Sequence, residues 1–389
     1  MSDDRGLLEE VDRAADTVND VAKDKIIEKV DTVEDTIVFS GVDHQTFAKE
    51  LTGRKVLDVK RHGKVFWLVL DGEGRMPVLH FGMTGMIHIQ GQEPAYYQRK
   101  PKDDGNEEWP PKNTKFVLHI AGSDGAAPTK IAFRDPRRLG RVRLCAEPEK
   151  EPPVSELGFD PILSMPPLEE FSPLIKKRNM PIKALLLDQS FSAGVGNWVA
   201  DEVLFHSRIH PEQRANTLSD DEIATLHEKI VYVCKTAVDL KADSEKFPDS
   251  WLFRHRWGKG KKGKGASLTL PDGRTATIKW ITVGGRTSAI VEEVQKAGSG
   301  SRGNSRMKKK SAKKAEEEEE EADGDAAVES SELSEPPTDD DEAGGKRKRA
   351  RKSSKAKAAS SSKPTAKGRS SKRRRKDEDE DEDEDEESA

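Results

Sequence analysis

Cysteine is scarce in this sequence, and the two that occur, Cys145 and Cys234, lie far apart in the chain. This pattern cannot supply a disulfide framework or a cysteine zinc site, and it favours a reducing compartment. Long apolar runs are missing too, since none approaches the roughly 20 residues that a membrane-spanning helix needs. Residues 1–4 lack the basic and apolar regions of a secretory signal. We therefore expect a soluble intracellular protein that has no membrane partner.

Aromatic and branched apolar residues are almost absent from about Gly298 onward. A segment of this composition cannot bury enough apolar surface to offset its ordering entropy, so we predict a disordered tail over 298–389. Charge in the tail comes in blocks, acidic over 316–321 and 377–387 and basic over 346–376. The basic block suits nuclear import and non-specific DNA contact, or alternatively it serves solubility alone.

The first 150 residues contain many short β-type runs separated by turn signals, after an amphipathic helix predicted over 7–22. Such runs predict a β-sandwich or barrel. The polar residues 92–112 are expected to form a surface insertion. The predicted strands cover 37–39, 55–60, 65–70, 78–81, 86–89, 116–120, 129–133 and 141–144.

Prolines between residues 152 and 167 indicate a linker, after which helical patterns begin. We predict helices over 181–189, 199–207 and 219–241. Ser219 and Glu222 form a capping-box pattern at the start of the last one. Residues 267–291 predict a hairpin, with 267–270 paired to 275–283 around a Pro-Asp-Gly turn.

Three polar residues stand in loops that suit phosphate binding. Lys64 precedes a predicted strand, Asn197 ends a glycine loop at a predicted helix start, and Arg286 follows two glycines. A helix N-terminus offers free backbone N–H groups to a phosphate, and Lys and Arg add positive charge. Each also has an ordinary alternative: a solvated lysine, an asparagine N-cap and a solvated turn arginine.

A second group of motifs contains Met83 and the run Arg137, Arg138 and Leu139. Met83 lies between two glycines, so it could wedge into a base stack, or it could pack in a β core. Arg137 and Arg138 could present forked donors to phosphates and base edges, or they could form a solvated turn.

In their order along the chain, these motifs resemble the formamidopyrimidine-DNA glycosylase family, particularly its plant and fungal members. The resemblance runs from about Leu8 to Gln295. It depends on eight stretches that occur in the family's order: 51–54, 61–64, 80–85, 135–140, 157–161, 194–202, 209–211 and 285–287.

The resemblance implies an α+β fold. Its expected domains are an N-terminal β-sandwich with flanking helices over 1–150, a helix–two-turn–helix domain over 151–245, a zincless β-hairpin finger over 246–297, and the tail over 298–389. Double-stranded damaged DNA is the implied partner, with the damaged nucleotide flipped out of the helix. Bacterial members hold zinc through two Cys-x-x-Cys pairs. Here the matching positions are Thr269, Asp272, Val291 and Val294, so we expect no metal and no cofactor.

Several residues match positions with known roles in the family. Lys64, Asn197 and Arg286 match the residues that grip phosphates around the flipped nucleotide. Met83 matches the wedge that fills the vacated space. The arginine pair that engages the opposite base is matched by Arg137 and Arg138, followed by Leu139 where the family often has an aromatic wedge. Leucine cannot stack as a ring, so insertion there should be weaker.

The start of the chain departs from the family, which opens with Pro-Glu-Leu-Pro-Glu-Val-Glu after methionine. In the family the proline amine attacks the sugar C1′ and the next Glu acts as acid and base. Here Gly6 and Leu7 occupy those two positions. Glu10 matches a second family Glu, so Glu10 and Lys64 remain as catalytic candidates. Either the gene starts differently, which we favour, or this polypeptide binds DNA without the standard chemistry.

The expected function is base excision repair: a DNA glycosylase that removes oxidised bases and cleaves abasic sites through a Schiff base. The alternative is a catalytically inactive reader of damaged or abasic DNA. A general chromatin factor would explain the basic block but not the other motifs. We expect a monomer in the nucleus, with an import receptor that binds the basic block over 346–376.

Overall fold

The computed structural model describes residues 8–92, 109–122, 127–257, 268–270 and 272–296. All of these belong to the first of two units into which the chain divides, residues 1–316 and 317–389. The predicted tail, and most of the insertion predicted over 92–112, lie outside the described residues. No helix among the described residues combines the length and the apolar character that crossing a membrane requires.

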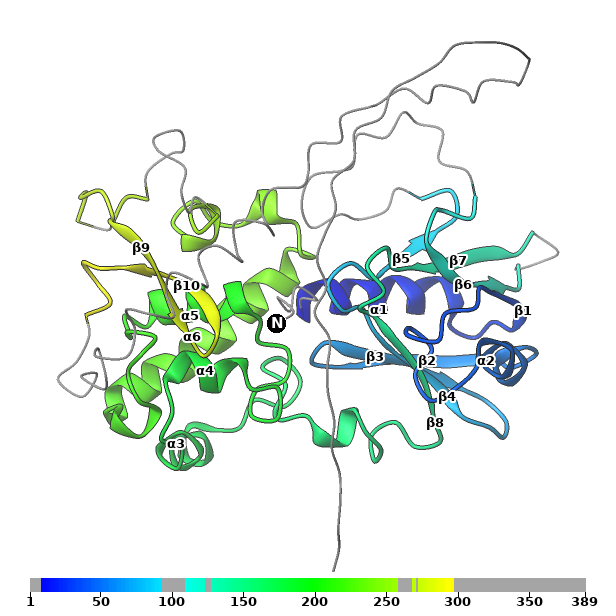
Figure 1. The fold of residues 1–389 in the computed structure, drawn as a ribbon, viewed down its shortest axis with the longest axis horizontal. Helices are drawn as coiled ribbons and strands as arrows, with labels where there is room; N and C mark the ends of the chain where they lie inside the picture. Colours follow the sequence, from blue (N-terminus) through cyan, green and yellow to red (C-terminus); the bar gives the residue numbers. More distant parts are fainter. Residues whose placement is uncertain (1–7, 93–108, 123–126, 258–267, 271, 297–389) are drawn as a thin grey trace, which may run out of the picture. The chain divides into compact units, whose positions relative to one another are not determined.

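The N-terminal part is a sandwich of two four-stranded antiparallel sheets, with the helices α1 (Leu8–Ala22) and α2 (His44–Leu51) packed against it (Figure 1). Apolar side chains from both sheets and both helices share one buried core, which includes Val11, Phe47, Phe66 and Phe116. The sandwich prediction is therefore confirmed. One sheet has the order β1 (Ile27–Thr32), β6 (Thr114–Ile120), β7 (Thr129–Arg134), β5 (Met86–Ile89); the other has β2 (Val56–His62), β3 (Val65–Leu70), β4 (Met76–His80), β8 (Arg141–Cys145).

Seven of the eight predicted strands are present, and the one over 37–39 is wrong. That segment is a turn because Asp35 Oδ1 accepts the backbone N–H groups of Ile37 and Val38, each at 3.1 Å. Strand β1 was not predicted. Its register shifts between Ile27 and Lys29, so its buried positions do not alternate as those of a regular strand do.

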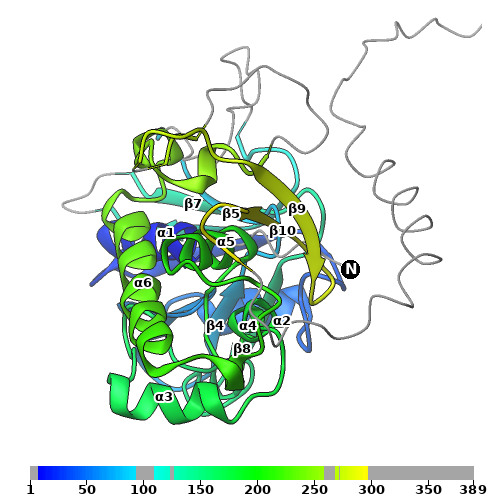
Figure 2. The same cartoon turned by 90° about the vertical axis from the view of Figure 1, so that its left-hand side faces the viewer.

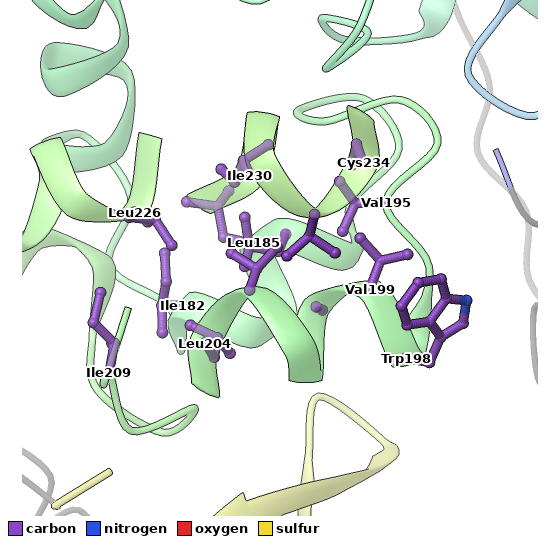
Figure 3. Packing of buried hydrophobic residues seen from close by; sticks show 14 of the residues in the cluster. Ile182, Leu185, Val195, Trp198, Val199, Leu204, Ile209, Leu226, Ile230 and Cys234 are labelled. Atoms are coloured by element: carbon purple, nitrogen blue, oxygen red, sulfur yellow. The ribbon is translucent and has the colours of Figure 1, made fainter. Parts of the chain in front are cut away.

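Four helices follow the linker: α3 (Leu168–Lys176), α4 (Ile182–Leu187), α5 (Asn197–His206) and α6 (Asp220–Asp239) (Figure 2). Their apolar side chains form one buried core, and Figure 3 shows part of it, where Leu185 of α4, Val199 of α5 and Ile230 of α6 pack together. The capping box of Ser219 and Glu222 is confirmed at the start of α6. Helix α3 was not predicted, and Pro173 lies inside it.

The finger is a hairpin of β9 (Ile278–Val283) and β10 (Arg286–Val291). Gly284 and Gly285 form its two-residue turn with φ of 61° and 78°, which favours glycine at both positions. The hairpin predicted between 267–270 and 275–283 is therefore wrong in its main pairing. Only a single bridge, Thr269 to Thr275, joins those segments among the described residues.

Short 3-10 turns complete the described chain. They are η2 (Val154–Glu156), η3 (Ala215–Thr217), η4 (Ser244–Lys246) and η5 (Leu252–Arg254). The last of these contributes Leu252 to a small apolar cluster with Leu268, Leu270, Ala289 and Val291. This cluster packs the finger against the segment that follows α6.

Candidate nucleic-acid interface

The turn between β2 and β3 contains Lys64, and the fully buried Asp160 binds this turn through hydrogen bonds. Asp160 Oδ2 accepts the backbone N–H of Gly63 at 2.7 Å and also binds the Arg61 guanidinium. Arg61 Nε donates to Asp12 of α1 at 2.9 Å. These charge-assisted hydrogen bonds fix the turn between α1 and the segment that precedes the helices.

Glycines let three distant segments meet beside this turn. A Cβ on Gly63 would lie 2.8 Å from Ala193 Cβ. A Cβ on Gly194 would lie 2.4 Å from Leu8 Cδ1, and 3.1 Å from the Cα of Gly63. Any larger side chain would force the segments apart. The first turn of α1, the Lys64 turn and the loop that leads to Asn197 therefore form one site, in which Lys64 is only 4% exposed.

Glu9 lies in this site as well, with 2% of its surface exposed. Burial raises the pKa of Glu9 to about 7, although its own backbone N–H and the nearby Lys64, Trp198 and Arg13 oppose the rise. The sequence analysis did not assign Glu9 a role. The available signal was a charged residue next to Leu8 on the apolar face of α1. Glu10 is half-buried on the same first turn.

Asn197, three residues after Gly194, lines a cavity of about 400 Å³ together with Arg286. The N-cap of α5 is Gly196, so the alternative of an Asn197 N-cap is wrong. Asn197 Oδ1 is buried and has no hydrogen-bond partner among the described residues. The cavity is thus lined by both the Asn197 side chain and Arg286. The other lining residues are Met180, Ala184, Leu187, Asp188 and Gly284.

The Met83 loop and the arginine loop are joined through Asp135, which is fully buried. Asp135 Oδ1 accepts from Thr84 Oγ1 at 2.8 Å, and Oδ2 accepts from the backbone N–H of Gly140 at 2.6 Å. Gly82 lies so close that a Cβ there would be 2.4 Å from the carbonyl of Leu139. The predicted wedge Met83 and the predicted arginine run are therefore neighbours. Met83 and Leu139 are both half-buried.

The two arginines of this loop differ in their contacts. The Arg138 guanidinium makes two hydrogen bonds to Asp35, at 2.8 and 3.0 Å, and Arg138 has a positive φ of 56°. Burial would raise the pKa of Asp35, but the hydrogen bonds from Arg138 and Lys115 outweigh it and hold the pKa well below its usual range. Both arginines are exposed. Among the described contacts, the Arg138 guanidinium pairs with Asp35, whereas Arg137 donates only its backbone N–H, to Thr84 and Asp135.

Within the described part of the chain, no three His, Cys, Asp or Glu side chains lie close enough together to hold a metal ion. The finger positions that match zinc ligands do not fit the metal, because Val291 is fully buried in the apolar cluster. The positions Gly6 and Leu7 lie outside the described residues.

Comparison with known proteins identifies the family. The family model for the formamidopyrimidine-DNA glycosylase N-terminal domain matches residues 8–142, and that for the formamidopyrimidine-DNA glycosylase H2TH domain matches residues 157–249. A formamidopyrimidine-DNA glycosylase of Arabidopsis thaliana is 39% identical over 289 residues, which cover 74% of this chain and 70% of that protein. The chain belongs to the formamidopyrimidine-DNA glycosylase family.

Bacterial members of the glycosylase family match as well. The formamidopyrimidine-DNA glycosylase of Bacillus subtilis is 30% identical over 239 residues, which cover 60% of this chain and 77% of that protein. A crystal structure of the Lactococcus lactis formamidopyrimidine-DNA glycosylase, bound non-covalently to DNA that contains an AP site, superposes with a TM-score of 0.57 at 22% identity. It covers 75% of this chain and 100% of the Lactococcus chain, and it shows that the fold is shared.

Proposed function

We propose that this protein is a base excision repair DNA glycosylase with AP lyase activity. Its substrates would be formamidopyrimidines and related oxidised bases in double-stranded DNA. Two observations carry the proposal: the first turn of α1, the Lys64 turn and the loop that leads to Asn197 meet, and Asn197 and Arg286 line one cavity. Family membership indicates the chemistry, and this geometry supports the proposed phosphate contacts.

The proposed roles follow from the chemistry of each side chain. Lys64, Asn197 and Arg286 would hold phosphates on either side of a flipped nucleotide, since donors to phosphate fix the register of a protein on DNA. Met83 would enter the space that the nucleotide leaves, and Arg137 and Arg138 would engage the opposite base and its neighbourhood. Glu9 adds a carboxyl whose raised pKa suits proton transfer near pH 7. Glu10 lies on the same turn of the helix.

A trapping experiment tests both the activity and the nucleophile. The full chain would be incubated with a duplex that carries one formamidopyrimidine or one abasic site, and borohydride would reduce any Schiff base. Because Gly6 and Leu7 replace the family's Pro and Glu, we expect little covalent adduct from this polypeptide, and efficient trapping from a variant whose first residues are rewritten as Met-Pro-Glu-Leu-Pro before Glu10. Strong trapping by the unmodified chain would overturn this expectation, and peptide mapping would then assign the adduct to Lys64 or to an α-amine. Tight binding of abasic duplex without base release by either chain would favour the inactive reader.

The cellular setting is part of the same proposal. We propose a nuclear monomer, imported through the basic block over 346–376, because clusters of Lys and Arg of this kind bind import receptors. A reporter fused to the full chain should enter the nucleus, and one fused to a chain that lacks 346–376 should not. A mass near 43.2 kDa in solution would support the monomer, and a doubled mass would refute it.

A further inference from the structure

Asp201 is a carboxylate that the proposed mechanism does not use, although it lies on the same helix as Asn197. The two residues are four positions apart on α5, so their side chains project from the same face of the helix. Asp201 is only 1% exposed. A carboxylate this deeply buried is costly unless donors surround it, which makes its partners informative.

Asp201 receives donors from three separate parts of the chain. Lys183 Nζ of α4 donates to Oδ1 at 2.6 Å. Arg256 donates to Oδ2 through Nη2 at 2.9 Å and Nε at 3.2 Å. The backbone N–H of Ala289 in β10 donates to Oδ2 at 3.1 Å. Lys183 is fully buried and Arg256 is 8% exposed, so these contacts are shielded from water.

The same partners also hold both strands of the finger hairpin. Lys183 Nζ donates to the carbonyl of Thr287, the residue after Arg286, at 3.0 Å. Trp280 Nε1 donates to the carbonyl of Arg256 at 2.9 Å. Trp280 of β9 and Ala289 of β10 are directly paired. Each strand is therefore bound at this position, β9 to the Arg256 carbonyl and β10 to Asp201. At the tip, a Cβ on Gly284 would lie 2.9 Å from Ala184 Cβ, which places the hairpin turn against α4.

We propose that Asp201 is a positioning residue, which holds Arg286 in register with Asn197 by anchoring the finger hairpin to α4 and α5. The apolar cluster of Leu252, Leu270 and Val291 already packs the finger. A buried ion network adds little net stability over apolar packing, but it can fix a single register. Because Arg286 and Asn197 line one cavity, a shift of the hairpin along α4 would separate the two predicted phosphate contacts.

This inference depends on the proposed function, and a double-mutant cycle separates the two. Affinity for a duplex with a tetrahydrofuran abasic analogue would be measured for the full chain across a salt series. The variants are Asp201→Asn, Arg286→Ala, Lys64→Ala and the two doubles that combine Asp201→Asn with each. We expect Asp201→Asn alone to weaken binding about tenfold, the size of one charge-assisted hydrogen bond.

The pattern of coupling distinguishes positioning from general destabilisation. In the Arg286→Ala background, Asp201→Asn should add less than about twofold, whereas in the Lys64→Ala background the full loss should remain. Asp201→Asn should also lower the slope of log affinity against log salt by about 0.9, as loss of one phosphate contact does. Equal losses in both backgrounds, or an unchanged slope, would overturn the inference.

A replacement variant and the Arg286→Ala single variant cover the two cases in which the cycle alone would not decide. If Asp201→Asn does not fold, Arg256→Gln replaces it in the same cycle, because that change leaves the Lys183 contact to Asp201 in place. It should show the same coupling to Arg286, and additive losses would overturn the inference. If Arg286→Ala alone leaves abasic-DNA affinity unchanged, then the phosphate role in the proposed function fails, and the positioning role fails with it.

Discussion

Among single residues, Glu9 is a buried carboxyl whose charge the fold disfavours. Its carboxyl lies in a buried site at the start of α1, and burial raises its pKa to about 7 from an ordinary value of 4.5. Between pH 4.5 and about 7, the Glu9 carboxyl therefore keeps its proton in the folded chain and has released it in the unfolded chain. The free energy of unfolding therefore falls as pH rises from about 4.5 to 7, and this contribution is constant above pH 7.

The variant Glu9→Gln tests this effect, because it removes the titration and keeps the shape. We expect the variant to exceed the wild type in free energy of unfolding by about 3 kcal/mol at pH 8, and by little at pH 4.5. Urea unfolding at both pH values would measure the difference. Glu10→Gln serves as the control, since Glu10 is half-buried on the same turn. A constant difference between wild type and Glu9→Gln at both pH values would contradict the assignment.

The two arginines of the 135–140 loop should separate folding from binding. Both arginines are exposed, but of the two only Arg138 pairs with the buried Asp35 among the described contacts. Arg137→Ala should leave the midpoint of thermal unfolding unchanged and lower the affinity for abasic duplex about tenfold, as loss of one good base or phosphate contact does. Arg138→Ala should lower both. Equal thermal midpoints for the two variants would show that the contact to Asp35 does not support the loop.

At the scale of elements, the Met83 loop and the arginine loop should act as one unit. Gly82→Ala would place a Cβ 2.4 Å from the carbonyl of Leu139, at a φ of 62°. We expect a marked fall in thermal stability and a loss of preference for damaged duplex, because both loops must shift. Gly53→Ala is the matched control. Gly53 has a φ of 86° but nothing within 4 Å, so it should show only the cost of the backbone conformation, about 1–2 kcal/mol. Similar effects of both variants would mean that the loops are independent.

The elements that the sequence predicted well are those with local signals. Strand β3, the capping box of Ser219 and the amphipathic α1 each depend on patterns within a few residues. The hairpin was misplaced because a Pro-Asp-Gly signal competed with the Gly284–Gly285 turn, and only packing decides between two such turns.

The site was predictable as a set of residues, but its supporting contacts were not. Family motifs named Lys64, Asn197 and Arg286; in the structure Asn197 and Arg286 line one cavity, and the Lys64 turn contacts the loop that leads to Asn197. Asp160 binds the backbone of Gly63, which lies 97 positions away in the chain, and Asp201 binds the backbone of Ala289, which lies 88 positions away. No local pattern marks a carboxylate as a partner of a distant backbone N–H. Such contacts are visible only in the folded structure.

For the whole molecule, the residues predicted to contact DNA and most of the charge of the tail fall in different units. The predicted DNA contacts lie within residues 1–316, and most of the tail charge lies within 317–389. Non-specific affinity for DNA depends on the number of phosphates that Lys and Arg neutralise, whereas damage preference depends on the site. The two properties should therefore be separable by truncation.

Deletion of 317–389 should weaken binding to intact and abasic duplexes by the same factor, because the basic block over 346–376 is lost from both complexes. The ratio of the two affinities should stay constant, and the salt dependence should become less steep. Deletion of 377–389 alone is the matched control: it removes an acidic block and keeps the basic one, so affinity for both duplexes should rise. Titrations of both duplexes over a salt series would measure all three chains. A change in the ratio on deletion of 317–389 would show that the tail takes part in recognising damage.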